Sequence, residues 1–168
     1  MTNLRGVFTL RTVRRKKLLG TWVDLDNVWV GDPATRFSDG AVSSPNTGYF
    51  GGGIPGPYST MDKVTYSSDT TAAVPGANLS LARGFFAATG NSDAGYFGGG
   101  SPTTSLMDKV TYSSDTTAAV PGANLTVARQ SLAATGNSDA GYFGGGPGPR
   151  STMDKVTYSS DTTAAVPG

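Results

Sequence analysis

The sequence contains no cysteine, no histidine and no glutamate. Without cysteine there is neither a disulfide framework nor thiolate chemistry. Without histidine the chain lacks the imidazole base and the usual nitrogen ligand of zinc. All twelve acidic residues are aspartates, a residue type common in turns. The commonest catalytic residue sets are therefore missing, and the sequence predicts a protein that is not an enzyme and uses no metal or cofactor.

Long apolar runs are missing too. No stretch approaches the roughly 20 apolar residues that cross a bilayer, and no apolar segment of signal-peptide length follows the N-terminal charges. We therefore expect no membrane insertion and no secretion signal. The net charge of +1 gives no bulk attraction to nucleic acid or membrane. The charge is uneven, however: residues 1–40 carry seven basic and four acidic side chains, and residues 41–168 carry six and eight.

An internal repeat fills most of the chain, which is rich in glycine and proline (24 and 10 of 168 residues). Met-Asp-Lys-Val-Thr-Tyr occurs at 61–66, 107–112 and 153–158, and Gly-Tyr-Phe-Gly-Gly-Gly at 48–53, 95–100 and 141–146. A period of about 46 residues with frequent turn signals is typical of a β-propeller blade of four short strands.

Each repeat divides into four short β-prone segments. In the first repeat these are residues 48–50, 61–66, 70–74 and 85–89. The second alternates apolar and polar residues, as a half-buried strand does. Ser67-Ser68-Asp69 is a predicted turn.

The repeat region is expected to begin with a drifted fourth segment. Counting back twelve residues from Gly48 gives Arg36, in register with Arg83 and Arg129. We therefore divide the chain into an N-terminal segment, 1–35, and a repeat region, 36–168. That region holds a strand four, two full repeats (48–94 and 95–140) and a partial repeat (141–168). The total is twelve strands in three groups, with the first strand in phase to complete the last group.

The repeats resemble kelch repeats over about 36–168. A hydrophobic strand runs into a glycine pair (Tyr49 to Gly52), an Asp-containing strand ends in tyrosine (Asp62 to Tyr66), and an arginine follows. The tryptophan of the usual pattern is replaced by Ala73 or Val74. The resemblance implies an all-β fold of kelch-like propeller blades, with four short antiparallel strands per repeat.

Propeller closure leaves several arrangements open. Three blades are too few for a ring, because four to eight is typical. Two chains would give six blades, and a longer parent chain or a trimeric β fibre are alternatives. A homo-oligomer, dimer or trimer, is expected.

The repeat sequence is also similar to that of repeat proteins of marine cyanophages and related phages. It shares Gly-Tyr-Phe-Gly-Gly-Gly, Asp-Lys-Val-Thr-Tyr-Ser-Ser-Asp and Ala-Ala-Thr-Gly-Asn, and its N-terminus, Leu4 to Phe8, is similar as well. This resemblance implies a virion-surface or tail-fibre protein.

The repeated acids are interpreted as structural. Asp62, Asp108 and Asp154 precede Lys63, Lys109 and Lys155. Adjacent strand residues point to opposite faces, so each of these aspartates is expected to pair with another element and not with its neighbouring lysine. Arg83 and Arg129, which recur in register, are the candidate partners, and the same reasoning applies to the turn aspartates Asp69, Asp115 and Asp161. The glycine triplets are expected to form tight turns, because no P-loop lysine or helix follows them. A calcium site at Asn91/Asp93 and Asn137/Asp139 has few ligands.

Positions that differ between repeats are the candidate recognition sites. They lie in the loop after each glycine triplet and at the entry to the fourth segment, where neutral drift is the alternative. The candidate residues are Tyr58, Phe85, Phe86 and Arg150.

The N-terminal segment is a candidate docking peptide. Residues 11–17 contain five basic side chains, and both tryptophans of the chain lie in this segment. A solvated charge run and nucleic-acid binding are the alternatives. The expected docking residues are Leu4, Arg5, Val7, Phe8, Arg14, Arg15, Lys16, Lys17, Trp22 and Trp29.

Taken together, these features favour a phage virion structural protein. Residues 1–35 would bind other virion proteins, with the tail as the expected location, and the repeat loops would contact a host receptor or glycan. Alternatives are a kelch-type protein-binding scaffold and a head-attached decoration fibre. A carbohydrate-active enzyme is disfavoured, because no set of acids stands apart from the repeat register.

Overall fold

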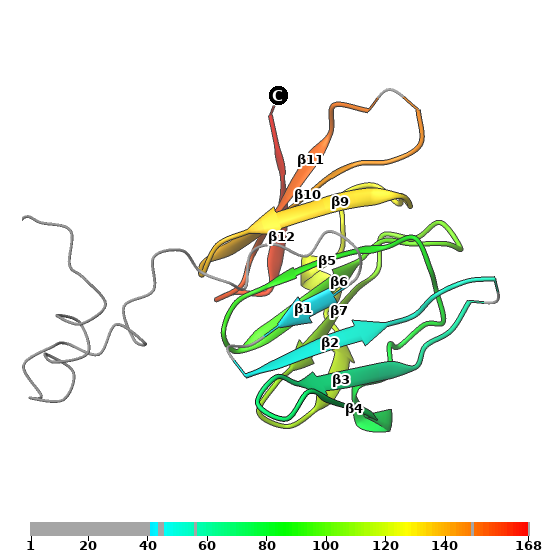
Figure 1. Cartoon of the computed structure of the whole chain (residues 1–168). Coiled ribbons are helices and arrows are strands. Elements are labelled where there is room, and N and C mark those ends of the chain that lie inside the picture. The colour runs from blue at the N-terminus through cyan, green and yellow to red at the C-terminus, as the bar shows by residue number, and fades with distance from the viewer. Residues whose placement is uncertain (1–40, 44–45, 56, 149, 168) are drawn as a thin grey trace, which may run out of the picture. The chain divides into compact units, whose positions relative to one another are not determined.

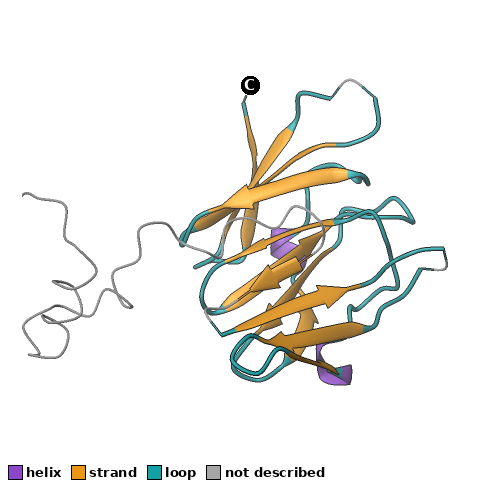
Figure 2. Cartoon of the chain, in the orientation of Figure 1, coloured by secondary structure: helices purple, strands orange, loops and turns teal. Residues whose placement is uncertain are grey.

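The computed structural model describes residues 41–43, 46–55, 57–148 and 150–167, and within them the protein is all-β. Twelve strands form three four-stranded antiparallel sheets (Figure 1), joined by two short 3-10 helices, η3 (Pro75–Ala77) and η4 (Pro121–Ala123) (Figure 2). The first sheet contains β1 (Ala41–Ser43), β2 (Thr47–Gly51), β3 (Met61–Thr65) and β4 (Thr70–Ala73). The second contains β5 (Ala87–Gly90), β6 (Ala94–Gly98), β7 (Met107–Thr111) and β8 (Thr116–Ala119). The third contains β9 (Leu132–Gly136), β10 (Ala140–Gly145), β11 (Met153–Thr157) and β12 (Thr162–Val166).

The strand content and the antiparallel order confirm the coarse prediction, but the assignment of the first strand was wrong. In each sheet the strands run in sequence order, so the predicted fourth segment of one repeat is the first strand of the next sheet. β1 pairs with β2 through Ala41 and Phe50, and the third sheet has its own first strand, β9. The first strand therefore does not complete the last sheet. Only three residues, 44–46, separate β1 from β2, too few to reach across to another sheet.

Alternation along the strands gives each sheet two different faces. Directly opposite residues such as Tyr49 and Lys63 share one face, and their neighbours Phe50 and Asp62 share the other. We call the first the forward face, because it contacts the following sheet, and the second the rear face. In repeat register, the forward-face residues are Tyr49, Met61, Lys63; Tyr96, Met107, Lys109; and Tyr142, Met153, Lys155.

The hydrophobic core lies between successive sheets. Forward-face Tyr49 and Met61 pack with rear-face Phe97 and Val110 of the second sheet, and Leu79 of the connection is buried with them. The second and third sheets repeat this packing with Tyr96, Met107, Phe143 and Val156 around Leu125. The first strands β1, β5 and β9 lie beside one another, as Figure 1 shows. The second sheet therefore buries both of its faces.

The connections place two kinds of turn at opposite edges of the sheets. The turn between β3 and β4 carries Asp69 at φ 50°, and Asp115 and Asp161 adopt 51° and 52° at the equivalent positions. Aspartate tolerates this left-handed backbone better than most residues. At the other edge the strands end in glycine triplets, in which Gly52 has φ +67° and its added Cβ would lie 2.4 Å from the Arg83 carbonyl oxygen. The triplets therefore form tight turns, as predicted.

Candidate functional site: the variable-loop edge

The buried arginines Arg83 and Arg129 make structural contacts inside the fold. Arg83 Nη1 lies 3.0 Å from Asp108 Oδ2, both side chains are fully buried, and Arg83 Nη2 donates to the Phe97 carbonyl at 2.9 Å. Nη1 has no hydrogen-bond partner among the described residues, so its contact with Asp108 is an ion pair without hydrogen-bond geometry. Burial lowers the pKa of Arg83, and the charge of Asp108 opposes that shift. Arg129 and Asp154 form the equivalent pair, so an arginine partner is confirmed for Asp108 and Asp154, whereas Asp62 is exposed.

A second set of polar contacts connects the forward face of one sheet to the turn of the next. Lys63 Nζ lies 2.9 Å from Asp115, the Tyr49 hydroxyl donates to the same carboxylate, and the Tyr49 ring stacks on Tyr112 with centroids 5.1 Å apart. We call this group the Tyr–Lys–Asp latch. Tyr96, Lys109, Asp161 and Tyr158 repeat it between the second and third sheets, with a Lys–Asp distance of 2.8 Å and a ring separation of 4.8 Å.

Electrostatics of the latch favour its ionised carboxylate. Burial raises the pKa of Asp115, but hydrogen bonds from Lys63 and Tyr49 outweigh that effect and hold the pKa below its usual value. The pKa of Lys63 is raised, chiefly by its hydrogen bond to Asp115. Sequence reasoning had treated the turn aspartates as structural but had missed their Tyr and Lys partners. The signal was present, since Tyr and Lys recur in the same register and on the same strand face.

The proposed calcium residues form turns instead. The Asn91 side-chain oxygen accepts the backbone N–H groups of Asp93 and Ala94 at 2.9 and 3.0 Å, and Asn137 repeats this arrangement. No group of three or more acidic side chains that could hold a metal ion occurs among the described residues. The asparagines in these positions therefore shape the connections between strands.

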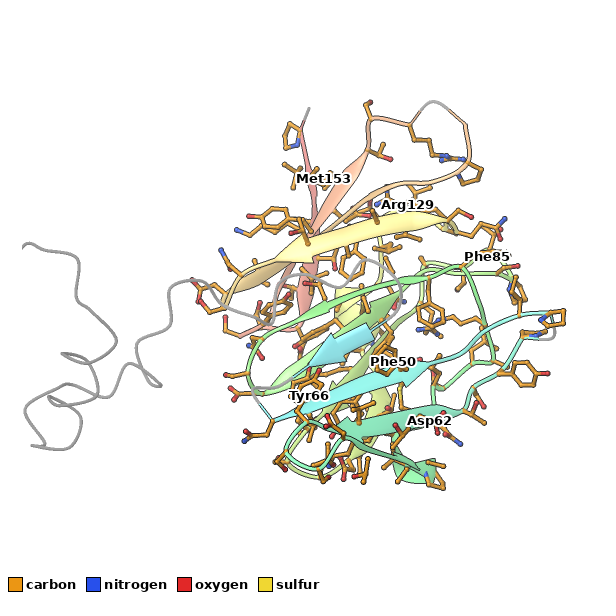
Figure 3. The ribbon with its side chains drawn as sticks, viewed as in Figure 1. Phe50, Asp62, Tyr66, Phe85, Arg129 and Met153 are labelled. Carbon is orange, nitrogen blue, oxygen red and sulfur yellow. The ribbon has the colours of Figure 1, made fainter. Side chains whose placement is uncertain are left out.

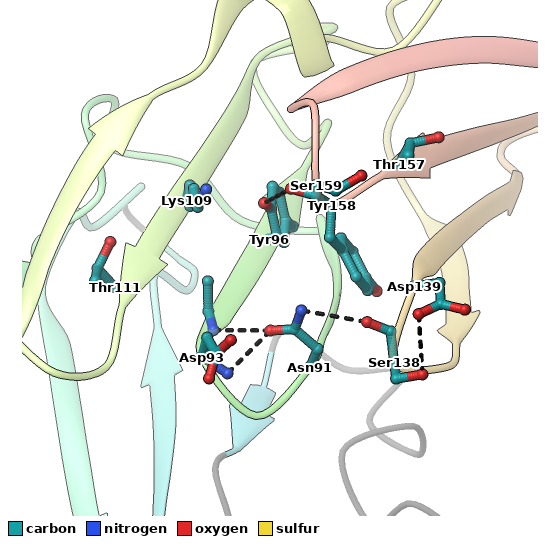
Figure 4. A pocket seen from close by; sticks show the side chains of 11 residues that line it. Asn91, Asp93, Tyr96, Lys109, Thr111, Ser138, Asp139, Thr157, Tyr158 and Ser159 are labelled. Atoms are coloured by element: carbon teal, nitrogen blue, oxygen red, sulfur yellow. Dashed lines mark hydrogen bonds between the residues drawn. The ribbon is translucent and has the colours of Figure 1, made fainter.

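Two polar grooves lie beside these turns. Figure 4 shows one of about 510 Å³ between the second and third sheets, where the Asn91 side-chain nitrogen donates to the Ser138 carbonyl at 3.3 Å. A groove of about 500 Å³ occupies the equivalent place between the first and second sheets, lined by Lys63, Asp93 and Tyr112 among others. Their recurrence follows from the repeat.

The variable positions gather at the edge formed by the glycine triplets. Gly84 and Ser101 form a β-bridge with N···O distances of 3.1 and 2.7 Å, which joins the entry of the second sheet to its own variable loop. Arg83 N–H donates to the Tyr58 carbonyl, and Arg129 N–H donates to Thr104 in the same way. Backbone bonds therefore hold these loops at one edge while their side chains differ.

Exposed apolar side chains mark this edge in the first repeat. Ile54, Tyr58 and Phe85 are 53%, 51% and 51% exposed, and Figure 3 shows Phe85 at the loop edge. A groove of about 550 Å³ is lined by Ile54, Pro55, Pro57, Phe85, Ser101 and Pro102. We call this set, together with Tyr58, the variable-loop edge. Its apolar lining fits binding of an apolar or aromatic group better than catalysis.

Phe85 has an unusual backbone for a large side chain. Its φ of 54° is left-handed, and the equivalent Ser131 has 53°. A bulky residue in this conformation is uncommon and costs on the order of 1 kcal/mol or more. Because half of the side chain is exposed, core packing does not repay that cost. Phe85 is thus the variable position with the strongest reason to contact something outside the chain.

The four predicted recognition residues do not all belong to this surface. Phe86 is buried at 8% exposure and packs edge-on against Phe97 with centroids 5.8 Å apart, so its assignment as a recognition residue was wrong. Residues 85 and 86 point in opposite directions, and sequence alone did not say which of them faced inward. Arg150 is exposed and its Nε donates to the Pro147 carbonyl at 3.1 Å. It lies on the loop of the third sheet.

The predicted docking residues between Leu4 and Trp29 lie outside the described residues. In the part of the chain that the structure describes, no helix is long and apolar enough to span a membrane. No protein-family model matches the chain, and no curated protein matches it.

Proposed function

We propose that this protein is a non-enzymatic phage virion component, most fittingly of the tail, that contacts the host surface through its variable-loop edge. Residues 1–35 would bind other virion proteins, and the sheets would be kelch-like propeller blades. The observation that carries the proposal is the separation of roles within each repeat. Invariant side chains make the contacts between sheets, whereas Tyr58, Phe85 and Ile54 differ between repeats and are exposed at one edge.

A surface of this kind suits binding of a receptor or glycan. Aromatic side chains supply large contact areas at low entropic cost, and tyrosine is enriched among residues that dominate interfaces. Rigid backbone bonds around Tyr58 and Gly84 present these side chains in a fixed geometry. Weak contacts would be multiplied by copy number on a particle.

Virion attachment is tested by immunogold labelling of purified particles with an antibody to the repeat region. Label on the tail upholds a tail role, and label over the head moves the protein to head decoration. Unlabelled particles from a lysate that contains the protein would remove the virion proposal and leave the kelch-type scaffold. Deletion of residues 1–35 should abolish incorporation and leave receptor binding intact.

Recognition is tested by binding of the labelled full chain to host cells. Tyr58→Thr and Phe85→Ser introduce the residues found at equivalent positions, Thr104 and Ser131, so the fold accommodates them. Each should weaken binding by about tenfold, as expected for a central aromatic contact of ~1–2 kcal/mol. The matched control is Leu81→Val, an exposed apolar residue exchanged for its register equivalent, Val127. Equal binding by all variants would refute recognition through this edge.

A further inference from the structure

Equivalent residues of the three sheets differ sharply in exposure at the two ends of the array. Rear-face Phe50 is 51% exposed, but Phe97 and Phe143 are fully buried. Tyr66 is 43% exposed, against 8% for Tyr112 and 5% for Tyr158. On the forward face the order is reversed, since Met153 is 42% exposed and its equivalents Met61 and Met107 are at 1% and 0%. The rear face of the first sheet and the forward face of the third are therefore uncovered core surfaces.

These two faces carry the halves of one Tyr–Lys–Asp latch. The forward face of the third sheet presents Tyr142 and Lys155, which are directly opposite each other across β10 and β11. The rear side of the first sheet presents Tyr66 and the turn residue Asp69, both exposed. Neither Lys155 nor Asp69 has an ion-pair partner among the described residues. The third sheet thus has the Tyr–Lys half of a latch without a partner aspartate, and the first sheet has the Tyr–Asp half without a partner lysine.

We propose that two copies of this chain associate head to tail through these faces. Tyr142 of one copy stacks on Tyr66 of the other and donates its hydroxyl to Asp69, and Lys155 pairs with the same carboxylate. Met153 and Phe50 become buried, as their equivalents are inside the chain. Both faces of each copy are used, which joins three sheets and three sheets into a closed ring of six, within the usual range for propellers.

A second copy fits better than an unrelated partner because the interface already exists twice within the chain. The first-to-second and second-to-third contacts use identical residue types, with Lys–Asp distances of 2.9 and 2.8 Å and tyrosine rings 5.1 and 4.8 Å apart. The end faces are complementary in charge, shape and apolar content by repetition. Because this contact is head to tail, it either closes or extends into a fibre.

The test is the mass of the purified full chain in solution, measured by light scattering after size-exclusion chromatography. We expect twice the chain mass of 17.1 kDa. Lys155→Asp should return the mass to that of one chain, because two acids then face each other, and Asp69→Lys should do the same with two bases. Both side chains are exposed, so neither substitution disturbs the core. Lys155→Asp is the cleaner variant, because Asp69→Lys also places lysine at a left-handed φ of 50°, and far-ultraviolet circular dichroism verifies that both variants fold. Arg150→Asp, with the same charge change on an exposed loop, should leave the dimer intact.

Mixing the two variants makes the test specific. In a mixed ring one interface carries the exchanged charges and the other carries the native pair, so a dimer of one chain of each kind should form where neither variant alone forms one. A double variant with both substitutions should also recover the dimer. A wild-type chain that remains single, an open fibre in place of a dimer, or a dimer that ignores both substitutions would overturn the proposal. This mass measurement needs neither a virion nor a host, so the dimer proposal can be refuted while the proposed function stands.

Discussion

At the scale of single residues, the repeat supplies its own matched comparisons. Asp108 is fully buried against Arg83, whereas Asp62, in the same register, is exposed. Asp108→Asn should lower the free energy of unfolding by about 3–5 kcal/mol, since it leaves a buried guanidinium without its counter-charge. Asp62→Asn should change it by less than about 0.5 kcal/mol. Denaturant unfolding of both variants measures the difference, and equal losses would contradict the structural role of the buried pair.

The glycines at equivalent places offer a second comparison. Gly99 has φ +72°, and an added Cβ would lie 2.6 Å from the Arg129 carbonyl oxygen; Gly145 has φ +82°, with nothing within 4 Å. Gly145→Ala should lower the free energy of unfolding by about 1–2 kcal/mol, because only the left-handed backbone disfavours alanine at this position. Gly99→Ala should cost clearly more, because backbone must also move. Thermal or denaturant unfolding ranks the two, and a larger loss for Gly145→Ala would show that the close approach is not what requires glycine.

Residue roles could be predicted where a repeated pattern constrained them. Arginine was predicted as the partner of the strand aspartates because strand alternation excludes the neighbouring lysine, and an arginine recurs in the same register. The opposite orientations of Phe85 and Phe86 were not predictable. They depend on the left-handed backbone at Phe85, a position that has neither the glycine nor the asparagine that would predict such a conformation. The residue type at this position therefore does not predict the turn that determines which of the two rings is buried.

At the scale of elements, the strands follow from the sequence but their grouping does not. Alternation predicted the segment at 61–66 and β-prone residues predicted the segment at 70–74, and β3 and β4 occupy them. Whether residues 85–89 close one sheet or open the next depends on the connection from Pro75 to Phe86. Leu79 is buried between the sheets, and Ser80 donates to Asp108 of the following sheet at 2.6 Å. These contacts carry the chain across to the second sheet before β5 begins.

The latch between elements should make stability depend on acid. The pKa of Asp161 lies below its usual value, because hydrogen bonds from Lys109 and Tyr96 outweigh the effect of burial. A carboxyl group with a lowered folded pKa contributes stability above its unfolded pKa of 3.8, and that contribution is lost as the pH falls through the folded pKa. Asp161→Asn should therefore cost about 1 kcal/mol at neutral pH. Below that range its unfolding free energy should converge with that of the wild type. A constant difference at every pH would contradict the ionised latch.

At the scale of the whole molecule, stability is expected to reside between the sheets, because each sheet buries its apolar residues only against a neighbour. In this respect the chain behaves as a repeat protein, whose ends differ energetically from its interior. The sequence makes the three repeats nearly identical, so it cannot show which copies of a residue are buried. That information appears only once the order of the sheets is known, and it separates the interior methionines from Met153.

Met107 and Met153 make this difference measurable. Met107→Ala removes a fully buried side chain between the second and third sheets and should lower the free energy of unfolding by about 2–5 kcal/mol. Met153→Ala, at 42% exposure, should cost less than about 0.5 kcal/mol when the chain is dilute enough to be single. At concentrations where chains associate, the cost of Met153→Ala should rise toward that of Met107→Ala, because the end face is then covered. Chemical denaturation at two protein concentrations separates these terms. A Met153 effect that is large in dilute solution would mean that the forward face of the third sheet is already covered within one chain.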